Sequence, residues 1–328
     1  MTAATTTTRT APTRSSWLPF ARRRAVRFLV SLWALLTAAF LMIHLIPGDP
    51  VRDALGLTAQ PDVVNARREA LGLNDPLVVQ YWNYLTDLVR GDLGTSLVSG
   101  TPVADLIGDR LPATVQLALL AFLVVVVVAV PVGVVMAVLT KGGRRRGGEL
   151  GFTSTSVVIA AIPEFLLAVA LVSLFAVTLG WLPVAGKDAP GSWVLPVLAL
   201  ALGPAAVLAR MVRVELLSVL GNDFVRTARA KRLPARLVYL RHALPNALTA
   251  TLTVGAMMLA ALVAGTVLVE NVFAWPGLGS TIVGSIQQKD YPAVQGIVLV
   301  YGTGVLLVNL AVDVVLALLD PRSTIREA

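Results

Sequence analysis

Six long apolar runs limit what this chain can fold into more than any other feature. Each is near or above the roughly 20 residues that an α-helix needs to cross the hydrocarbon core of a bilayer. Because lipid offers the backbone no hydrogen-bond partners, runs of this length must cross as helices. We therefore predict an all-α, polytopic membrane protein with six transmembrane helices. They lie near Val26–Ile46, Ala113–Thr140, Phe152–Trp181, Trp193–Val212, Asn246–Val269 and Ala293–Leu319.

The overall composition points to the same class of protein. Of the 328 residues, 56% are hydrophobic and only 14% are charged, and the mean hydropathy is +0.78. Cysteine is absent, which excludes a disulfide framework and any thiolate metal site. A basic N-terminus followed by an apolar run is also typical of a signal peptide. This run is as long as a span and no small-x-small cleavage site follows it, so we predict an uncleaved signal anchor.

Lysine and arginine are concentrated on one side of the predicted membrane. Twenty of the 27 basic residues lie in the segments 1–27, 141–146, 210–241 and 322–326. By the positive-inside rule these segments face the cytoplasm, which places both termini there. The net charge of +8 then reflects this asymmetry and an attraction to anionic membrane lipid. Because each basic cluster adjoins a span, we predict no nucleic-acid partner.

The spans divide the chain into five segments. We expect a disordered cytoplasmic tail at 1–25, a first transmembrane helix at 26–46 and an extracytoplasmic helical segment at 47–110. A larger transmembrane domain with a cytoplasmic loop at 214–245 follows at 111–320, and a cytoplasmic tail ends the chain at 321–328. The extracytoplasmic segment carries nine acidic residues against five arginines. Apolar residues at helical spacing in Val63–Leu71 and Val78–Val89 predict a small helical cap there, with a solvated loop as the alternative.

A turn follows the fifth predicted span. Pro276, Gly277 and Gly279 interrupt any helix at this point, so we predict a short re-entrant or interfacial helix over Ser280–Ile286. Trp275 and Tyr291 flank the turn and are placed as interfacial anchors.

The basic loop between the fourth and fifth spans predicts two short helices. Asn222 or Asp223 can cap the first, since a short polar side chain accepts the free N–H groups of an opening turn. Leu233 is pushed out of helical geometry by Pro234, which then starts the second helix. A helix–break–helix facing the cytoplasm predicts a docking element for a soluble partner, with a lipid-bound basic helix pair as the alternative. Its basic residues are Arg226, Arg229, Lys231, Arg232, Arg236 and Arg241.

This loop resembles the cytoplasmic loop of ABC importer permeases. That family's pattern is Glu-Ala-Ala, three residues, Gly, nine residues, then Ile-x-Leu-Pro. Ala228 matches the second Ala, and His242, Leu244 and Pro245 fall on the closing positions, whereas Arg226, Thr227 and Arg232 depart from Glu, Ala and Gly. The resemblance implies a loop that couples the chain to an ATPase. Its residues would be Asp223, Arg226, Thr227, Ala228, Ala230, Pro234, His242, Leu244 and Pro245.

Five further motifs, in order along the chain, resemble those of peptide and nickel permeases. They are Ile46-Pro-Gly-Asp-Pro, Gly91-Asp-Leu-Gly-Thr-Ser, Arg110-Leu-Pro-Ala-Thr, Glu270-x-Val-Phe-x-Trp-Pro-Gly-Leu-Gly and Asp290-Tyr-Pro-x-x-Gln-Gly. The resemblance implies a B-type permease of a dipeptide, oligopeptide or nickel ABC importer in a bacterial cell membrane. It further implies a second homologous permease, ABC ATPase subunits and an extracytoplasmic solute-binding protein. Peptide cargo is the favoured interpretation, and nickel or another small solute is the alternative.

The chain lacks the motifs of an enzyme. The nearest approach to a phosphate-binding loop runs from Gly180 to Asp188, but it is one residue too long and has Asp where Ser or Thr is required. ATP hydrolysis therefore belongs to other subunits, and we predict no cofactor, metal or catalytic residue. The titratable candidates are Glu164, Asp313, His44 and His242. Asp313 can pair with a basic residue near the cytoplasm, and Glu164 can bond backbone groups freed by Pro163.

Two classes of membrane protein are weighed as alternatives. An intramembrane enzyme would need a metal-binding or nucleophile motif, and none is present. A proton-coupled secondary transporter is the stronger alternative, and it would need inverted repeats and paired acids within the bundle. Copurification of ATPase subunits distinguishes it from an ABC permease.

Arg232 poses a separate question about the loop. A Gly at this position would end the first helix in the left-handed conformation. Either Arg232 adopts that conformation, or the helix runs one residue further and Leu233-Pro234 alone makes the break. We expect the second outcome, since Pro already prevents the preceding residue from staying helical.

Overall fold

The computed structural model describes residues 17–45, 51–52, 60–70, 72–143 and 145–319. The described residues are nearly all helical, and their one pairing of extended segments is an isolated bridge between Thr95 and Pro102. Five helices are long and apolar enough to cross a membrane, and a bent pair makes a sixth. The predicted all-α, polytopic fold is therefore confirmed.

The helices fall into a long group and a short group. The long ones are α1 (Trp17–Leu45), α5 (Val103–Thr140), α8 (Val194–Val219), α11 (Leu244–Val272) and α13 (Tyr291–Leu319). The shorter elements are α3 (Pro61–Ala70), α4 (Leu77–Val89), η2 (Lys141–Gly143), α6 (Arg146–Ala161), α7 (Glu164–Leu171), η3 (Val172–Thr178), α9 (Asp223–Ala230), α10 (Ala235–Leu237), η4 (Val238–Ala243) and α12 (Leu278–Gln287).

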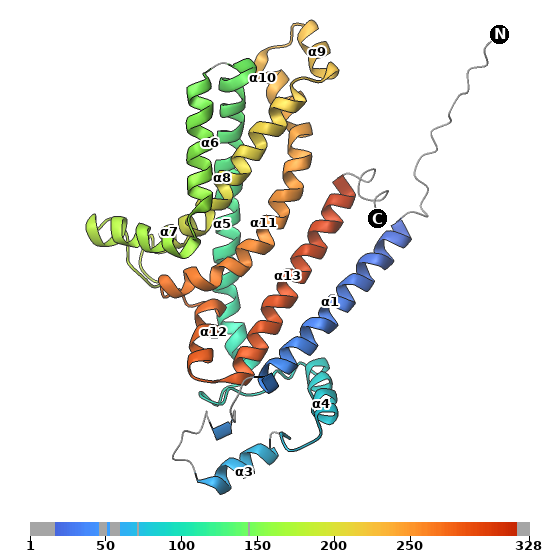
Figure 1. The fold of residues 1–328 in the computed structure, drawn as a ribbon, viewed down its shortest axis with the longest axis vertical. Coiled ribbons are helices and arrows are strands. Elements are labelled where there is room, and N and C mark those ends of the chain that lie inside the picture. Colours follow the sequence, from blue (N-terminus) through green and yellow to red (C-terminus); the bar gives the residue numbers. More distant parts are fainter. Residues whose placement is uncertain (1–16, 46–50, 53–59, 71, 144, 320–328) are drawn as a thin grey trace, which may run out of the picture.

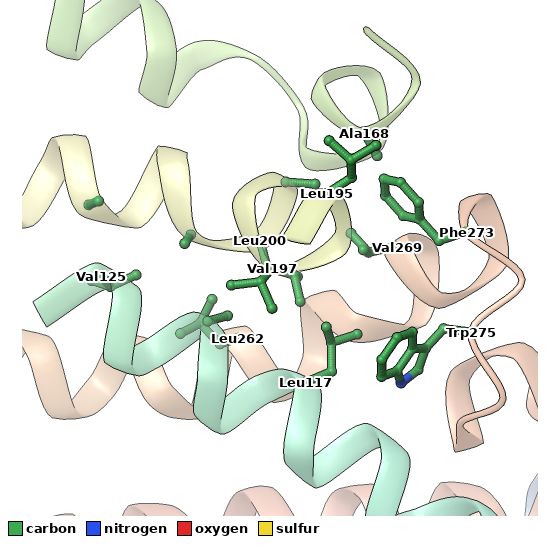
Figure 2. Close-up of a cluster of buried hydrophobic side chains, with 14 of the residues drawn as sticks. Leu117, Val125, Ala168, Leu195, Val197, Leu200, Leu262, Val269, Phe273 and Trp275 are labelled. Atoms are coloured by element: carbon green, nitrogen blue, oxygen red, sulfur yellow. The ribbon is translucent and has the colours of Figure 1, made fainter. Parts of the chain in front are cut away.

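The long helices form a central bundle with a flanking pair. In Figure 1, α5, α8 and α11 cross one another at the centre, and α1 runs beside α13 at one side. The α9 end of the bundle lies opposite the end that carries α3, α4 and α12. The core sits where the three central helices meet. Figure 2 shows Leu117, Leu200 and Leu262 from these three helices converging, with Phe273 and Trp275 at one edge.

Two central helices, α5 and α8, approach each other closely at Gly133 of α5. A Cβ added there would stand 2.6 Å from the Ala209 carbonyl oxygen and 2.6 Å from the Val212 Cβ, both on α8. Only a glycine allows α5 and α8 to pack this closely, as small residues commonly do between membrane helices.

We therefore expect Gly133→Ala to lower the thermal stability of the purified protein markedly, because two helix backbones must separate. Gly108 is the matched control in the same helix, since no atom lies within 4 Å of a Cβ added there. Gly108→Ala should be neutral or stabilising by up to about 1 kcal/mol, the helix-propensity gain of alanine over glycine. Thermal unfolding in detergent measures both. Equal unfolding temperatures for the two variants would contradict the close approach.

The third predicted span, Phe152–Trp181, is not one continuous helix. It is divided into α6 and α7, which are bent by 98° at the break, and η3 continues α7 as a π-helix. The break has a local cause. Pro163 forces the preceding Ile162 into extended geometry, with φ −74° and ψ 123°. Figure 1 shows α6 running beside α5 and α7 turning sharply from the direction of α6, and α7 packs against α8 and α11.

Several predicted boundaries also differ from the structure. α1 begins at Trp17, so residues 17–25 are helical and the predicted disordered tail does not extend over them. α5 begins at Val103, inside the predicted extracytoplasmic segment. The prediction of disorder for residues 1–16 and the Ile46–Pro50 motif lie outside the described residues. The helices predicted near Val63–Leu71, Val78–Val89 and Ser280–Ile286 are confirmed as α3, α4 and α12.

Two pairs of motifs identified in the sequence contact each other at the α12 end. Ser96 donates a hydrogen bond to the Asp290 carboxylate, and the Leu97 N–H donates to Asp290 Oδ1 at 3.0 Å. The motif at Gly91 is thereby joined to the motif at Asp290. These bonds attach the loop before α5 to the start of α13.

The second pair of motifs is joined by Glu270, which is fully buried. Its carboxylate accepts hydrogen bonds from the Thr114 hydroxyl at 2.7 Å and from the backbone N–H groups of Gly279 at 2.6 Å and Ser280 at 3.2 Å. Thr114 in turn accepts a bond from the Leu278 N–H at 2.8 Å. Glu270 thus satisfies the free N–H groups that open α12 and connects that helix to α5.

Trp275 and Tyr291 are not the interfacial anchors predicted from sequence. Trp275 is 1% exposed, and its indole N–H donates to the Ala113 carbonyl at 3.1 Å. Tyr291 is also buried. The prediction was wrong because this indole finds its polar partner inside the protein rather than at a membrane surface.

Candidate functional site

α9 and its flanking turns form the candidate site at one end of the bundle. Figure 1 shows α9 beyond the ends of α6, α8 and α10. Asn222 occupies the N-cap position with extended geometry, φ −73° and ψ 153°, although its side chain makes no capping hydrogen bond. Asp223, in the first turn, stabilises the start of the helix electrostatically. A carboxylate complements the positive end of the helix dipole.

α9 is held to the bundle by one apolar face. Val225 and Ala228, three residues apart, are buried in a cluster that includes Leu216 of α8, Leu220 directly after α8 and Val238 of η4. The opposite face is exposed. Its residues are Asp223, Phe224, Arg226, Thr227, Arg229 and Ala230. A short helix that packs on the bundle through one face and exposes the other face is suited to contact another protein.

Arg232 takes the left-handed conformation, with φ +56°. The Arg232 N–H donates to the Arg229 carbonyl at 2.9 Å, and the Leu233 N–H donates to the Ala228 carbonyl at 3.4 Å. These two bonds are the Schellman arrangement that ends helices, with Arg232 at the position usually taken by glycine. Our expectation that the helix would run one residue further is therefore wrong. The two bonds offset the strain, and α9 ends at Ala230.

The left-handed conformation destabilises a non-glycine residue by about 1–2 kcal/mol of free energy. We therefore expect Arg232→Gly to raise the unfolding temperature slightly and to preserve assembly. Arg232→Ala is the control, since it removes the same charge and keeps a Cβ. It should show no gain. Thermal unfolding of the purified chain compares the two. A gain of equal size in both variants would attribute the effect to charge instead of backbone strain.

The second predicted short helix does not stand alone. α10 begins after Pro234, which takes the N-cap position instead of starting the helix, and it continues through η4 into α11. His242, Leu244 and Pro245 therefore lie on a continuous helix rather than in the loop. Pro245 has no N–H for the carbonyl four residues earlier, and its ring crowds that carbonyl. The preceding turns of η4 widen into a π-helix, which relieves this crowding.

The basic residues of the loop remain accessible. All six predicted basic residues, Arg226, Arg229, Lys231, Arg232, Arg236 and Arg241, are exposed. Arg226 contacts Asp223 at 3.3 Å, but both side chains are largely open to solvent, so the ion pair contributes little to stability. The residues that the family resemblance assigns to ATPase coupling therefore differ in their exposure. Ala228 packs inward, whereas Arg226, Thr227, Ala230 and Pro234 face outward.

A buried arginine behind α9 was missed in the sequence. Arg213 of α8 is 7% exposed, donates to the Thr140 hydroxyl at 3.0 Å and pairs with Glu149 of α6 at 2.6 Å. It therefore joins α5, α6 and α8 close to the loop. Its sequence signal was an arginine within an apolar run, which requires a partner.

The four titratable candidates lie on separate elements. Asp313 of α13 pairs with Arg24 of α1 at 2.6 Å, which confirms the expected partnership with a basic residue. His44 contacts the Phe40 carbonyl and the Gln80 side chain, and His242 lies on η4. Glu164 opens α7 and lies against Gly265 of α11, where an added Cβ would be 2.5 Å from the carboxylate.

Comparisons with known proteins identify the family. Residues 129–325 match the binding-protein-dependent transport system inner membrane component, and residues 17–118 match the N-terminal domain of such membrane components. The chain belongs to this family. It is a multi-pass inner-membrane permease component of an ABC importer, and its family is one of transport proteins rather than enzymes.

Curated relatives agree with this assignment, and a solved structure has a similar fold. The chain is 36% identical over 304 residues to the glutathione transport system permease protein GsiC of Escherichia coli O6:H1, covering 93% of this permease and 98% of the relative. It is 39% identical over 299 residues to GsiC of Pectobacterium atrosepticum, with 91% and 96% covered. An inward-facing MetNI methionine ABC transporter shares the fold, with a TM-score of 0.52 and 21% identity over 66% of this permease and 96% of that chain.

Proposed function

We propose that this permease is driven by an ATPase subunit that docks on α9. The observation that carries the proposal is the fixed, outward-facing helix. Val225 and Ala228 anchor it, while Phe224 and Thr227 are open to a partner. A force applied to α9 passes into α8 and η4 through the shared buried cluster. Because η4 is continuous with α11, movement of α9 is transmitted to a helix of the central bundle.

The remaining partners follow from the family. A second homologous permease completes the pathway, and an extracytoplasmic solute-binding protein delivers cargo at the opposite end. The helices α3, α4 and α12 lie at that end (Figure 1). The exposed basic residues around α9 support placing this end and both termini in the cytoplasm.

The cargo that the comparisons favour is a peptide. The relatives at 36–39% identity are named for glutathione, which is itself a small peptide. Nickel or another small solute is the alternative that the motifs leave open. Competition binding to the cognate solute-binding protein, with glutathione, dipeptides, longer peptides and Ni²⁺ as competitors, decides between them. The proposal predicts that a peptide competes and Ni²⁺ does not.

The docking role is tested by removing the helix. We expect deletion of Asp223–Leu233 to abolish copurification of ATPase subunits and uptake, while the chain still inserts into the membrane. The deletion leaves all the long spans intact. Retention of both ATPase binding and uptake in the deletion variant would refute docking on α9.

The proposed orientation makes a separate prediction. Reporter fusions after Ala328 and at Asp62 of α3 should report opposite sides of the membrane, with the C-terminal fusion cytoplasmic. The 20-to-7 distribution of lysine and arginine is the reason. Paired alkaline phosphatase and fluorescent-protein fusions measure this. The same side for both sites would overturn the topology.

A further inference from the structure

α4 is an amphipathic helix whose inner face packs on the end of α1. The Tyr81 hydroxyl lies 2.8 Å from the Thr37 hydroxyl, and the Phe40 ring centroid lies 5.1 Å from that of Tyr81 and 5.6 Å from that of Tyr84. Figure 1 shows α4 beside the end of α1, away from the central bundle. This aromatic contact accounts for one face of α4.

A second face of α4 is also apolar and has no cover among the described residues. Val78, Trp82 and Val89 are 80%, 70% and 89% exposed. They are spaced by four and seven residues and so lie along one stripe of the helix. The sequence of α4, LVVQYWNYLTDLV, contains one charged residue, Asp87. A contiguous apolar stripe of this kind marks a surface that is covered in the working protein.

The contacts of α4 with α1 fix its depth. The candidate span of α1 is Leu18–His44, and Thr37 lies inside it. Seven residues of helix from Thr37 to His44 correspond to about 10 Å at 1.5 Å per residue. With this span taken as the membrane crossing and the orientation proposed above, Tyr81, which reaches Thr37, lies within the outer part of the bilayer. Trp82 is its immediate neighbour.

From this depth and this stripe, we propose that α4 is anchored in the outer leaflet of the membrane. Val78, Trp82 and Val89 contact lipid at the boundary between headgroups and acyl chains. Tryptophan favours this region because its ring is apolar and its N–H remains near water. An amphipathic helix with an apolar stripe binds there through its buried apolar area. A soluble binding protein is the less favoured occupant, because headgroups occupy that level.

The anchoring also fixes the segment that precedes α4. The Gln80 side-chain amide donates to the Leu73 carbonyl at 3.2 Å and to the Asp75 carbonyl at 2.7 Å, and its oxygen lies 3.1 Å from His44 Nε2. Gln80 thus attaches the turn between α3 and α4 to a helix held by lipid. The α3–α4 region is thereby a platform set on the membrane surface rather than a free cap.

The absence of cysteine allows a direct test with single spin labels. The variants are Val78→Cys, Trp82→Cys and Val89→Cys, each in the full-length chain purified with its associated subunits and placed in lipid nanodiscs. Leu29→Cys, exposed within the α1 span, is the lipid control, and Asp62→Cys on α3 is the water control. The measurement compares collision of each label with oxygen, which concentrates in lipid, and with a water-soluble nickel chelate.

The proposal predicts that the three α4 labels behave as Leu29→Cys does, with oxygen accessibility above that of the nickel chelate. If they follow Asp62→Cys, the stripe faces water and the proposal fails. If both reagents are excluded from the α4 labels, and access returns only when associated subunits are removed, the stripe is covered by protein and the proposal also fails. Adding the solute-binding protein should leave the α4 labels unchanged.

Discussion

Replacing Glu270 with leucine is expected to have the largest effect of any single substitution in this permease. The change removes the acceptor for the Thr114 hydroxyl and for the N–H groups of Gly279 and Ser280. Each buried donor left without a partner costs about 1–3 kcal/mol. Because these donors open α12 and join it to α5, we expect little folded protein to accumulate. Thermal unfolding of the detergent-purified chain, followed by size-exclusion chromatography, measures the loss.

Two further variants define the cause of this effect. Glu270→Gln keeps one acceptor oxygen, so its unfolding temperature should lie between those of the wild type and Glu270→Leu. Glu69→Leu removes an exposed carboxylate on α3 and should leave the unfolding temperature unchanged. A Glu270→Leu protein as stable as the wild type would show that these hydrogen bonds do not hold α12 in place.

Replacing Phe224 with serine is expected to separate transport from folding. Phe224 is 42% exposed on the open face of α9, whereas Val225 beside it is fully buried. Large aromatic side chains contribute most of the binding energy at many protein interfaces, and losses of 2 kcal/mol or more are common when one is truncated, roughly a 30-fold weakening. We therefore expect ATPase subunits to be lost on purification and uptake to fall at least tenfold.

The matched control for Phe224 is Val98, which is 49% exposed in the loop before α5. Val98→Ser should retain both ATPase subunits and uptake, since it lies at the other end of the molecule from α9. Unfolding temperatures of the two variants should match that of the wild type. A Phe224→Ser permease with normal ATPase binding would place the docking surface elsewhere.

Local patterns in the sequence predict most of the helices. Apolar length identifies α1, α5, α8, α11 and α13, and helical spacing finds α3 and α4. Pro276, Gly277 and Gly279 predict the turn before α12. These features succeed because span length and turn chemistry depend on neighbouring residues only. The salt bridge of Asp313 was predicted for the same reason, since an acid within a span requires a partner.

Features that depend on distant contacts could not be predicted. Trp275 was placed at the interface because nothing in its own segment shows the Ala113 carbonyl that its indole reaches. The 98° bend after α6 begins at Pro163, but the local sequence does not specify its angle or the contacts of α7 with α8 and α11. Arg232 adopts a strained conformation because two backbone bonds outweigh its preference. In the candidate site, the sequence predicted the short helix α9 and missed the buried Arg213 of α8, while the docking role of α9 stays a prediction.

The most direct test of this account is uptake by proteoliposomes that contain the purified permease complex and its solute-binding protein. Radiolabelled glutathione and a labelled dipeptide are the two probes, each measured with enclosed ATP and with a proton gradient alone. We predict ATP-dependent accumulation of at least one probe by the wild type, and its loss in Phe224→Ser with the fold intact. Uptake driven by the proton gradient without ATP, or unchanged in Phe224→Ser, would contradict the claim that an ATPase drives this permease through α9.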